Sequence, residues 1–117
     1  MRHVIQNHDT ENSKPFSEPV FLILTSLAGG ARHGYALMQD IQDISNQRVR
    51  LSTGTLYGAL RRLLEDGLIE RFEQQDKSRD KQAYKLTREG RRQLELEITR
   101  MEQLARLASR RMKERKA

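Results

Sequence analysis

The apolar positions of this chain recur at the spacing of an α-helix over most of its length. Residues 17–28 begin with a capping serine, carry proline in the first turn and are then apolar on nearly all sides, which predicts a buried helix. A second helix is predicted from His33 to about Ile44, with Asp40 facing outward. Its inner face is expected to hold Ala36, Leu37, Ile41 and Ile44.

The segment 52–67 predicts a short helix with both ends marked, by Ser52 as the N-cap and by Gly67 as the left-handed residue that closes the C-terminus. Its apolar face is expected to hold Leu56, Leu60, Leu63 and Leu64. Its outward face holds Gly54, Thr55, Gly58, Arg61 and Arg62. Two glycines inside a helix cost about 1 kcal/mol each relative to alanine, so a surface must approach this face closely. That pattern suits insertion into a DNA major groove, and the alternative is a surface helix that tolerates its glycines.

Two strands are predicted after this helix, at 68–75 and 82–86, with the polar run 76–81 between them. Together they form a β-hairpin with a charged tip. A further short strand is predicted at 48–51, before the capping serine. The side chains expected to share one face of the hairpin are Leu68, Phe72, Tyr84 and Leu86.

A long helix capped by Thr87 is predicted to fill the rest of the chain. About 25 helical residues at 1.5 Å each span nearly 40 Å, which is longer than a core of this size reaches. Its apolar seam therefore predicts a homodimer, and the alternative is a single amphipathic helix folded back on the core. The seam follows a heptad spacing through Leu94, Ile98, Met101, Ala105, Ala108 and Met112, with Leu104 and Leu107 widening it.

The charge of the chain is unevenly distributed along it. Its 117 residues, enough for about one domain, carry a net charge of +6. Residues 1–47 hold three Lys/Arg and five Asp/Glu, residues 48–87 hold nine and six, and residues 88–117 hold ten and five. The cationic excess thus lies on the third helix, the hairpin and the long helix, as expected of a nucleic-acid-binding surface. A soluble basic protein with solvated charges would show the same sum.

Several functional classes are disfavoured by what the sequence lacks. It has no cysteine, no apolar run long enough to span a membrane and, over residues 1–15, no apolar core of a signal peptide. We therefore expect a cytoplasmic protein without a membrane partner, with a disordered N-terminal arm over 1–15. No catalytic or metal-binding motif is present, because His3, His8 and His33 do not combine with carboxylates at ligand spacing. We expect no enzyme activity, no metal and no cofactor.

In this order the elements resemble a winged helix-turn-helix with an added dimerisation helix, an α+β but mainly α fold, and the chain resembles the PadR family of transcriptional regulators. The resemblance covers residues about 17–94 and looks like the short subclass with a single C-terminal helix. It implies a winged-helix DNA-binding domain at 16–86 and a dimerisation helix with a basic tail at 87–117. The motifs that carry it are His33-Gly34-Tyr35, Ser52-Thr53-Gly54-Thr55-Leu56-Tyr57, Leu60-Arg61-Arg62-Leu63, Gly67-Leu68-Ile69 and Tyr84-Lys85-Leu86-Thr87-Arg88-Glu89-Gly90.

The resemblance implies that the third helix enters the major groove of double-stranded DNA while the wing tip contacts the flanking backbone. The residues expected to contact DNA are Tyr35, Ser52, Thr53, Thr55, Tyr57, Arg61 and Arg62, with Lys77, Arg79 and Lys81 on the wing. Tyr57 sits beside the apolar face and is expected to be half-buried. Asp76 and Asp80 dilute the charge of the wing tip, which departs from the family pattern.

Some family members also bind a planar small-molecule effector at the dimer centre, against an aromatic residue of the long helix. This chain has no Trp and no aromatic residue beyond Tyr84, so Met101 and Ile98 are the candidates to line such a site. We interpret the chain as a homodimeric DNA-binding regulator, a repressor on a roughly palindromic operator, which an apolar or aromatic effector could release. The alternatives are a nucleoid-type binder without sequence preference and a protein-interaction adaptor.

Overall fold

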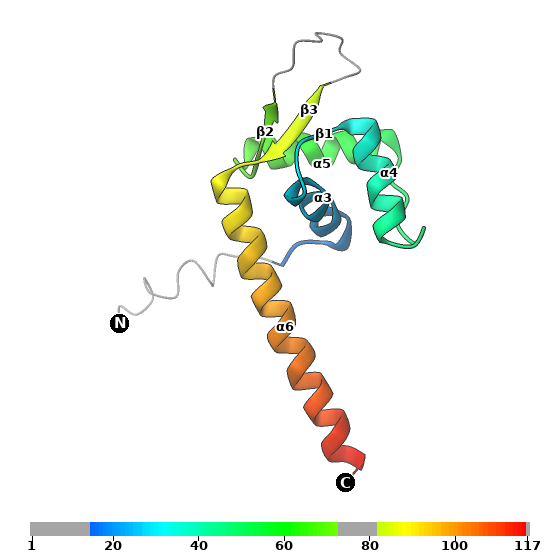
Figure 1. Cartoon of the computed structure of the whole chain (residues 1–117), viewed down its shortest axis with the longest axis vertical. Coiled ribbons are helices and arrows are strands. Elements are labelled where there is room, and N and C mark those ends of the chain that lie inside the picture. The colour runs from blue at the N-terminus through cyan, green and yellow to red at the C-terminus, as the bar shows by residue number, and fades with distance from the viewer. Residues whose placement is uncertain (1–14, 73–81, 117) are drawn as a thin grey trace, which may run out of the picture. The chain divides into compact units, whose positions relative to one another are not determined.

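A computed structural model describes residues 15–72 and 82–116 of the chain. It contains a mainly helical fold with a small antiparallel sheet, which confirms the predicted fold class. Internal contacts divide the described chain after Leu94 into Phe16–Leu94, here called the winged unit, and the part of the last helix that begins at Glu95. The elements in chain order are α3 (Glu18–Ala28), β1 (Arg32–His33), α4 (Gly34–Ile44), α5 (Thr53–Glu65), β2 (Ile69–Phe72), β3 (Ala83–Leu86) and α6 (Arg88–Lys116) (Figure 1).

The sheet differs from the prediction in its third strand. Its order is β1-β3-β2, with both neighbours antiparallel, and β3 is central. The prediction of a strand at 48–51 is wrong, because residues 49–51 have no regular secondary structure. The chain turns just before them, with positive φ at Asn46 and Gln47, and Val49 N donates a 3.0 Å hydrogen bond to Ser45 Oγ. The edge strand is instead Arg32–His33, which pairs with Tyr84 and Ala83.

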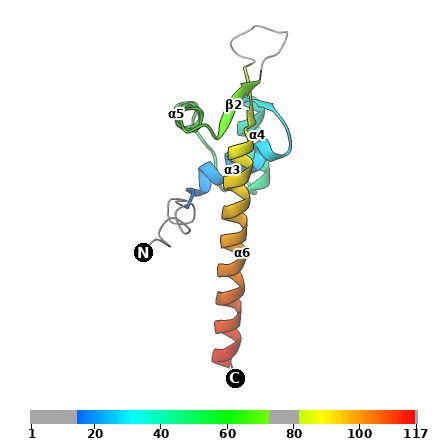
Figure 2. The same cartoon turned by 90° about the vertical axis from the view of Figure 1, so that its left-hand side faces the viewer.

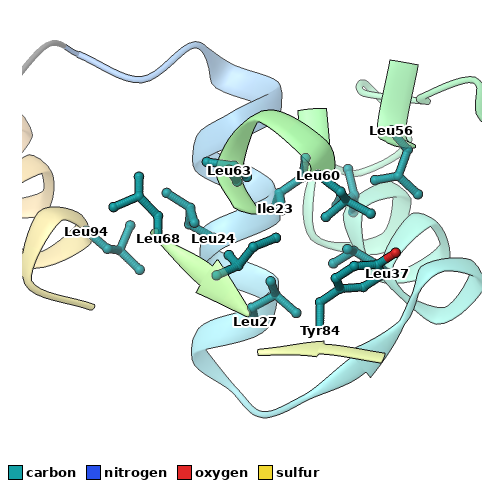
Figure 3. Close-up of a cluster of buried hydrophobic side chains, with 12 residues drawn as sticks. Ile23, Leu24, Leu27, Leu37, Leu56, Leu60, Leu63, Leu68, Tyr84 and Leu94 are labelled. Atoms are coloured by element: carbon teal, nitrogen blue, oxygen red, sulfur yellow. The ribbon is translucent and has the colours of Figure 1, made fainter. Parts of the chain in front are cut away.

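One apolar cluster joins the three helices of the winged unit to the sheet and to the start of α6 (Figure 3). Leucine and isoleucine side chains of α3, α4 and α5 meet beside the sheet, and Tyr84 enters the cluster from β3. All the predicted inner positions of α5 join it, with Leu64 only partly buried. The buried members are Ile23, Leu24, Leu27, Leu37, Ile41, Leu56, Leu60, Leu63, Leu68, Ile69, Tyr84 and Leu94.

Three side chains lie elsewhere than predicted. Ile44 is exposed at the last turn of α4. Phe72 is also exposed, because it pairs with Ala83 on the face of the hairpin opposite to Ile69, which is buried in its place. The Phe72 ring packs instead under the ammonium group of Lys85, 5.3 Å from the ring centroid.

Asp40 is the third side chain that lies elsewhere than predicted. It does not face solvent but lies partly buried in a polar cluster. Ser26 Oγ donates a hydrogen bond of 2.5 Å to its carboxylate, and Arg32 Nε lies 3.6 Å from the same oxygen. Arg32 also donates a 3.1 Å hydrogen bond to the Ser26 carbonyl. The cluster therefore fastens α3, β1 and α4 together, and it satisfies the hydroxyl of a serine that is almost fully buried.

The end of α5 and the start of α6 are joined directly. Gly67, at φ +75°, closes α5 as a Schellman motif, in which Leu68 N donates to Leu63 O and Gly67 N donates to Leu64 O. Thr87 Oγ1 donates a 2.6 Å hydrogen bond to the Gly67 carbonyl and accepts one of 2.9 Å from Gly90 N. The predicted cap of the long helix is thus confirmed, and the same threonine ties α6 to the end of α5.

Helix α6 continues without interruption from Arg88 to Lys116 (Figure 2). Its side chains from Met101 to Arg115 are all exposed in the single chain. Within the described ranges, no helix combines the length and the apolar character that crossing a membrane requires.

Replacing Glu89 by glutamine is expected to destabilise the start of α6 near neutral pH but not in strong acid. The hydrogen bond from Arg92, with a smaller contribution from Gln93, lowers the pKa of Glu89 from 4.5 to about 2. A lowered carboxyl pKa stabilises the fold above pH 4.5, and that contribution is lost as the pH falls towards 2. Thermal melts of the Glu89→Gln and wild-type proteins should therefore differ at pH 7 and converge near pH 2. A constant difference in melting temperature across that window would contradict this account.

Candidate nucleic-acid interface

The N-terminus of α5 presents two hydroxyl groups to solvent. Ser52 Oγ accepts a 3.1 Å hydrogen bond from Thr55 N, as the predicted cap requires. The Ser52 hydroxyl also donates to Thr55 Oγ1, at 2.9 Å. Because Thr55 Oγ1 accepts this bond, the Thr55 hydroxyl keeps its own hydrogen for an external acceptor. Thr53 is exposed beside them, so this end of the helix can donate to phosphate or base-edge oxygens.

The outward face of α5 has no protein neighbour at its glycines. A Cβ atom built on Gly54 or Gly58 would meet no described atom within 4 Å other than its own chain neighbours and the nearby backbone of α5. A shallow hollow of about 250 Å³ lies over the second glycine, lined by Gly58, Arg61, Arg62 and Glu65. The helical glycines therefore serve no packing within the described chain, and an external surface can reach the backbone of α5 here.

Two arginines supply positive charge to the same face. Arg61 and Arg62 are exposed, and neither side chain forms a hydrogen bond or ion pair with any residue that the structure describes. Both side chains line the hollow together with Glu65, the one carboxylate there. An unpaired guanidinium presents several donors in a fixed plane, so each arginine can bind the O6/N7 edge of guanine or a phosphate.

Tyr57 connects α5 to the start of α4. Tyr57 is 41% exposed, more than the prediction expected, and its hydroxyl end lies against Gly34. A Cβ atom at Gly34 would overlap the Tyr57 hydroxyl and lie 2.9 Å from Cζ, so any larger residue here would have to displace the end of the Tyr57 side chain. Burial, with a smaller contribution from Tyr57, raises the pKa of neighbouring Tyr84. This contact sets α4 beside α5 and explains the glycine between His33 and Tyr35.

The start of α4 adds a second polar group next to α5. Tyr35 is 66% exposed, and its hydroxyl accepts a 3.1 Å hydrogen bond from Gln39 Nε2. Gln39 was not among the predicted site residues, although its i, i+4 spacing from Tyr35 signals the contact. His33 caps α4 without a side-chain bond, and its buried Nδ1 has no partner among the described residues.

Only the strands of the wing, and not its tip, lie within the described residues. The predicted contacts Lys77, Arg79 and Lys81 lie outside the described residues. At the base of the hairpin, Arg71 is an exposed cation that the sequence interpretation did not select. Lys85 pairs with Glu70 at 3.8 Å, which partly neutralises it.

The first residue of the predicted dimer seam of α6 differs from the others in its burial. Leu94 is only 5% exposed and belongs to the core of the winged unit, so it is not available to another subunit, contrary to the prediction. The remaining seam residues are exposed, Met101 to 42%. Leu104 and Leu107 extend this apolar surface. The exposed seam consists of Ile98, Met101, Ala105, Ala108 and Met112.

Known proteins resemble this chain over most of its described part. An uncharacterized 37.1 kDa protein in a transposon of Streptomyces fradiae is 39% identical over 84 residues, which are 72% of this chain but only 23% of that protein. A PadR family transcription regulator from Clostridium difficile superposes with a TM-score of 0.66 at 24% identity, covering 80% of this chain and 96% of that one. Bacillus subtilis PadR, solved in complex with operator DNA, gives 0.59 at 24% identity, covering 69% and 46%.

The structural likenesses establish the fold, and the sequence itself establishes the family. Residues 23–96, more than half of the chain, match the model of the family described as "Transcriptional regulator PadR-like family". That segment begins in α3, contains the whole of α4, α5 and the described hairpin strands, and ends just past Leu94. The chain therefore belongs to the PadR-like family of transcriptional regulators.

Proposed function

We propose that this protein is a sequence-specific DNA-binding repressor that acts as a homodimer on a roughly palindromic operator. The observation that carries the proposal is the outward face of α5, where two unhindered glycines lie beside two unpaired arginines. Helices that read DNA place such a face in the major groove, where close approach lets short side chains reach base edges.

The relatives favour duplex DNA over other ligands. Membership of a family of transcriptional regulators makes DNA the expected partner, and the related Bacillus subtilis PadR was solved with operator DNA. Repression would follow from occupying a promoter. Tyr35, Ser52, Thr53, Thr55, Arg61 and Arg62 are the described residues that we assign to the DNA contact, and Tyr57 acts through its contact with α4.

The dimer is proposed from the exposed seam of α6. Beyond Leu94, an apolar strip of five residues has no partner in the winged unit's core, and heptad spacing fits a second copy of the same helix. A two-fold dimer would read two half-sites about one helical turn apart, which is why the operator is expected to be palindromic. Met101 and Ile98 at this interface are the residues that would line a site for an apolar or aromatic effector.

The rival functions are separated by one comparison. DNA bound from a genomic library would be selected and sequenced, and affinity for the selected site would be measured against random duplex at the same salt concentration. A common palindromic motif with much tighter binding supports the proposal. Equal affinities would indicate a nucleoid-type binder, and no binding at low salt would indicate a protein-interaction adaptor.

Replacing Arg61 by alanine is expected to weaken operator binding. If Arg61 reads a guanine, the loss should be about 1–3 kcal/mol and preference should relax at one position in each half-site. If it holds a phosphate, affinity should fall for all sequences alike and the salt dependence should decrease. Arg91→Ala, which removes an exposed arginine from α6, is the charge-matched control. Unchanged affinity and salt dependence in Arg61→Ala would remove this residue from the interface.

A further inference from the structure

The net charge of α6 lies entirely in its C-terminal part. Residues 88–103 carry four arginines and four glutamates, whereas residues 104–116 carry six Lys/Arg and one glutamate. The chain as a whole has a net charge of +6, so the last three turns and a half of this helix hold most of the excess. This segment belongs to the unit that begins at Glu95, and α5 belongs to the winged unit.

The arginines of the two parts also differ in their partners. In the first part, two of the four arginines are paired, Arg92 with Glu89 at 2.9 Å and Arg100 with Glu97 at 2.7 Å. In the second part, Arg106, Arg110 and Lys113 are exposed, and none of them forms an ion pair with a described residue. Their charges are therefore available to an external anion.

These three cations form one line along the helix. They occur at i, i+4 and i+7, a spacing that puts them on one face over about 10 Å. At about 100° per residue, this line lies about 130° around the helix from the exposed seam, so a dimer formed through the seam would leave it open. Like charges at this spacing repel one another and weaken an isolated helix. The helix dipole accounts for cations in the last turn but not for Arg106 and Arg110, which precede it.

We propose that this line, defined as Arg106, Arg110 and Lys113, is a second DNA-contact surface that binds the phosphate backbone without sequence preference. Phosphates of one strand follow each other every 3.4 Å along the duplex axis, so a cationic line of about 10 Å passes about three of them. Two of its three members are arginines, which hold phosphate oxygens in a bidentate manner. The surface acts independently of α5.

Duplex DNA fits this line better than a membrane does. Helices that lie in a membrane surface bury large apolar or aromatic side chains opposite their cations. The apolar face of this segment has no aromatic residue, and it is the proposed dimer seam with its border, so a dimer would cover it; its members are Leu104, Ala105, Leu107, Ala108 and Met112. Anionic lipid is accordingly an outcome that the experiment must distinguish.

The test compares two pairs of arginines on the same helix in the full-length protein. Arg106→Gln/Arg110→Gln removes two charges from the line. Arg111→Gln/Arg115→Gln removes two charges with the same i, i+4 spacing from a face about 100° or more away. Affinity for a 30-bp duplex of mixed sequence is measured by fluorescence anisotropy over a range of salt concentrations. Circular dichroism and sedimentation check that both variants keep the helix and the oligomeric state of the wild type.

The line variant is expected to reduce the slope of log K against log[salt] by about two for each subunit that binds the duplex, because each phosphate that is no longer neutralised lowers the slope by about 0.9. The control variant should keep the wild-type slope. An unchanged slope in the line variant, or an equal reduction in both, would overturn the proposal. So would loss of binding to phosphatidylglycerol vesicles with duplex binding intact, which would identify a lipid surface.

A second background separates this proposal from the proposed function. The same slopes are measured in protein that also carries Arg61→Ala/Arg62→Ala. If α5 and the α6 line both bind DNA, the two sets of changes reduce the slope independently. If only the α6 changes have an effect, the line stands while the assignment of α5 fails. If only the α5 changes reduce the slope, the assignment of α5 stands and the proposal for the α6 line fails.

Discussion

Replacing Met101 by aspartate is expected to give a folded monomer whose operator affinity is reduced by roughly 10²–10⁴-fold, the range by which linking two binding modules raises affinity. Met101 lies in the middle of the exposed seam, between Ile98 and Ala105. In a two-fold dimer the new carboxylate would be buried close to its symmetry mate without a cation to pair with it. The core of the winged unit ends at Leu94, so its packing should be unaffected.

Thr99→Asp is the matched control for this substitution. Thr99 is exposed on the same helix, two residues away, and lies about 160° around the helix from Met101. It introduces the same charge and should leave the dimer intact. Sedimentation gives the oligomeric state, circular dichroism gives the helix content, and a gel-shift titration gives operator affinity. A folded Met101→Asp protein that sediments as a dimer would mean that the dimer forms through another surface.

The helices of this protein were predictable because their signals are local. Ser17, Ser52 and Thr87 each bond a backbone N–H three residues ahead, so each helix start is encoded within one turn. The strand Arg32–His33 has no such signal. It is two residues long and exists because Ala83–Tyr84, about fifty residues later, pairs with it. Asp40 was misplaced for the same reason, since its partner Ser26 belongs to another helix.

The candidate site, too, was predictable only where its signals are local in the sequence. Helical periodicity alone identified the outward residues of α5, because the buried leucines on the other face fix the rotation of the helix. The role of Gly34 was not predictable, because it depends on the Tyr57 ring from the next helix. The seam of α6 was predictable as a pattern. The residue at which it leaves the core, after Leu94, required the packing of α6 against the hairpin and the other helices.

Replacing Gly90 by alanine is expected to destabilise the winged unit. A Cβ atom at Gly90 would overlap the carbonyl oxygen of Leu68 and lie 2.9 Å from its carbonyl carbon. That carbonyl is backbone and accepts a hydrogen bond from Thr87 N, so it cannot move aside without loosening the junction of α5, β2 and α6. Forcing extra atoms into a packed site typically costs about 1–3 kcal/mol. Chemical denaturation should therefore show a lower midpoint with an unchanged slope.

The same glycine-to-alanine change at Gly58 is the control, and it should act in the opposite direction. Nothing lies within 4 Å of a Cβ at Gly58, and alanine is favoured over glycine in a helix by about 1 kcal/mol, so Gly58→Ala should raise the denaturation midpoint. If the hollow beside Arg61 and Arg62 receives DNA, that more stable protein should nonetheless bind its operator more weakly. Stability would then rise while operator affinity falls, which distinguishes a contact surface from a folding defect. A Gly58→Ala protein that is stabilised and binds its operator with wild-type affinity would show that DNA does not approach the helix backbone at this point. A Gly90→Ala protein as stable as the wild type would show that the junction of α5, β2 and α6 can shift to make room for the added Cβ atom.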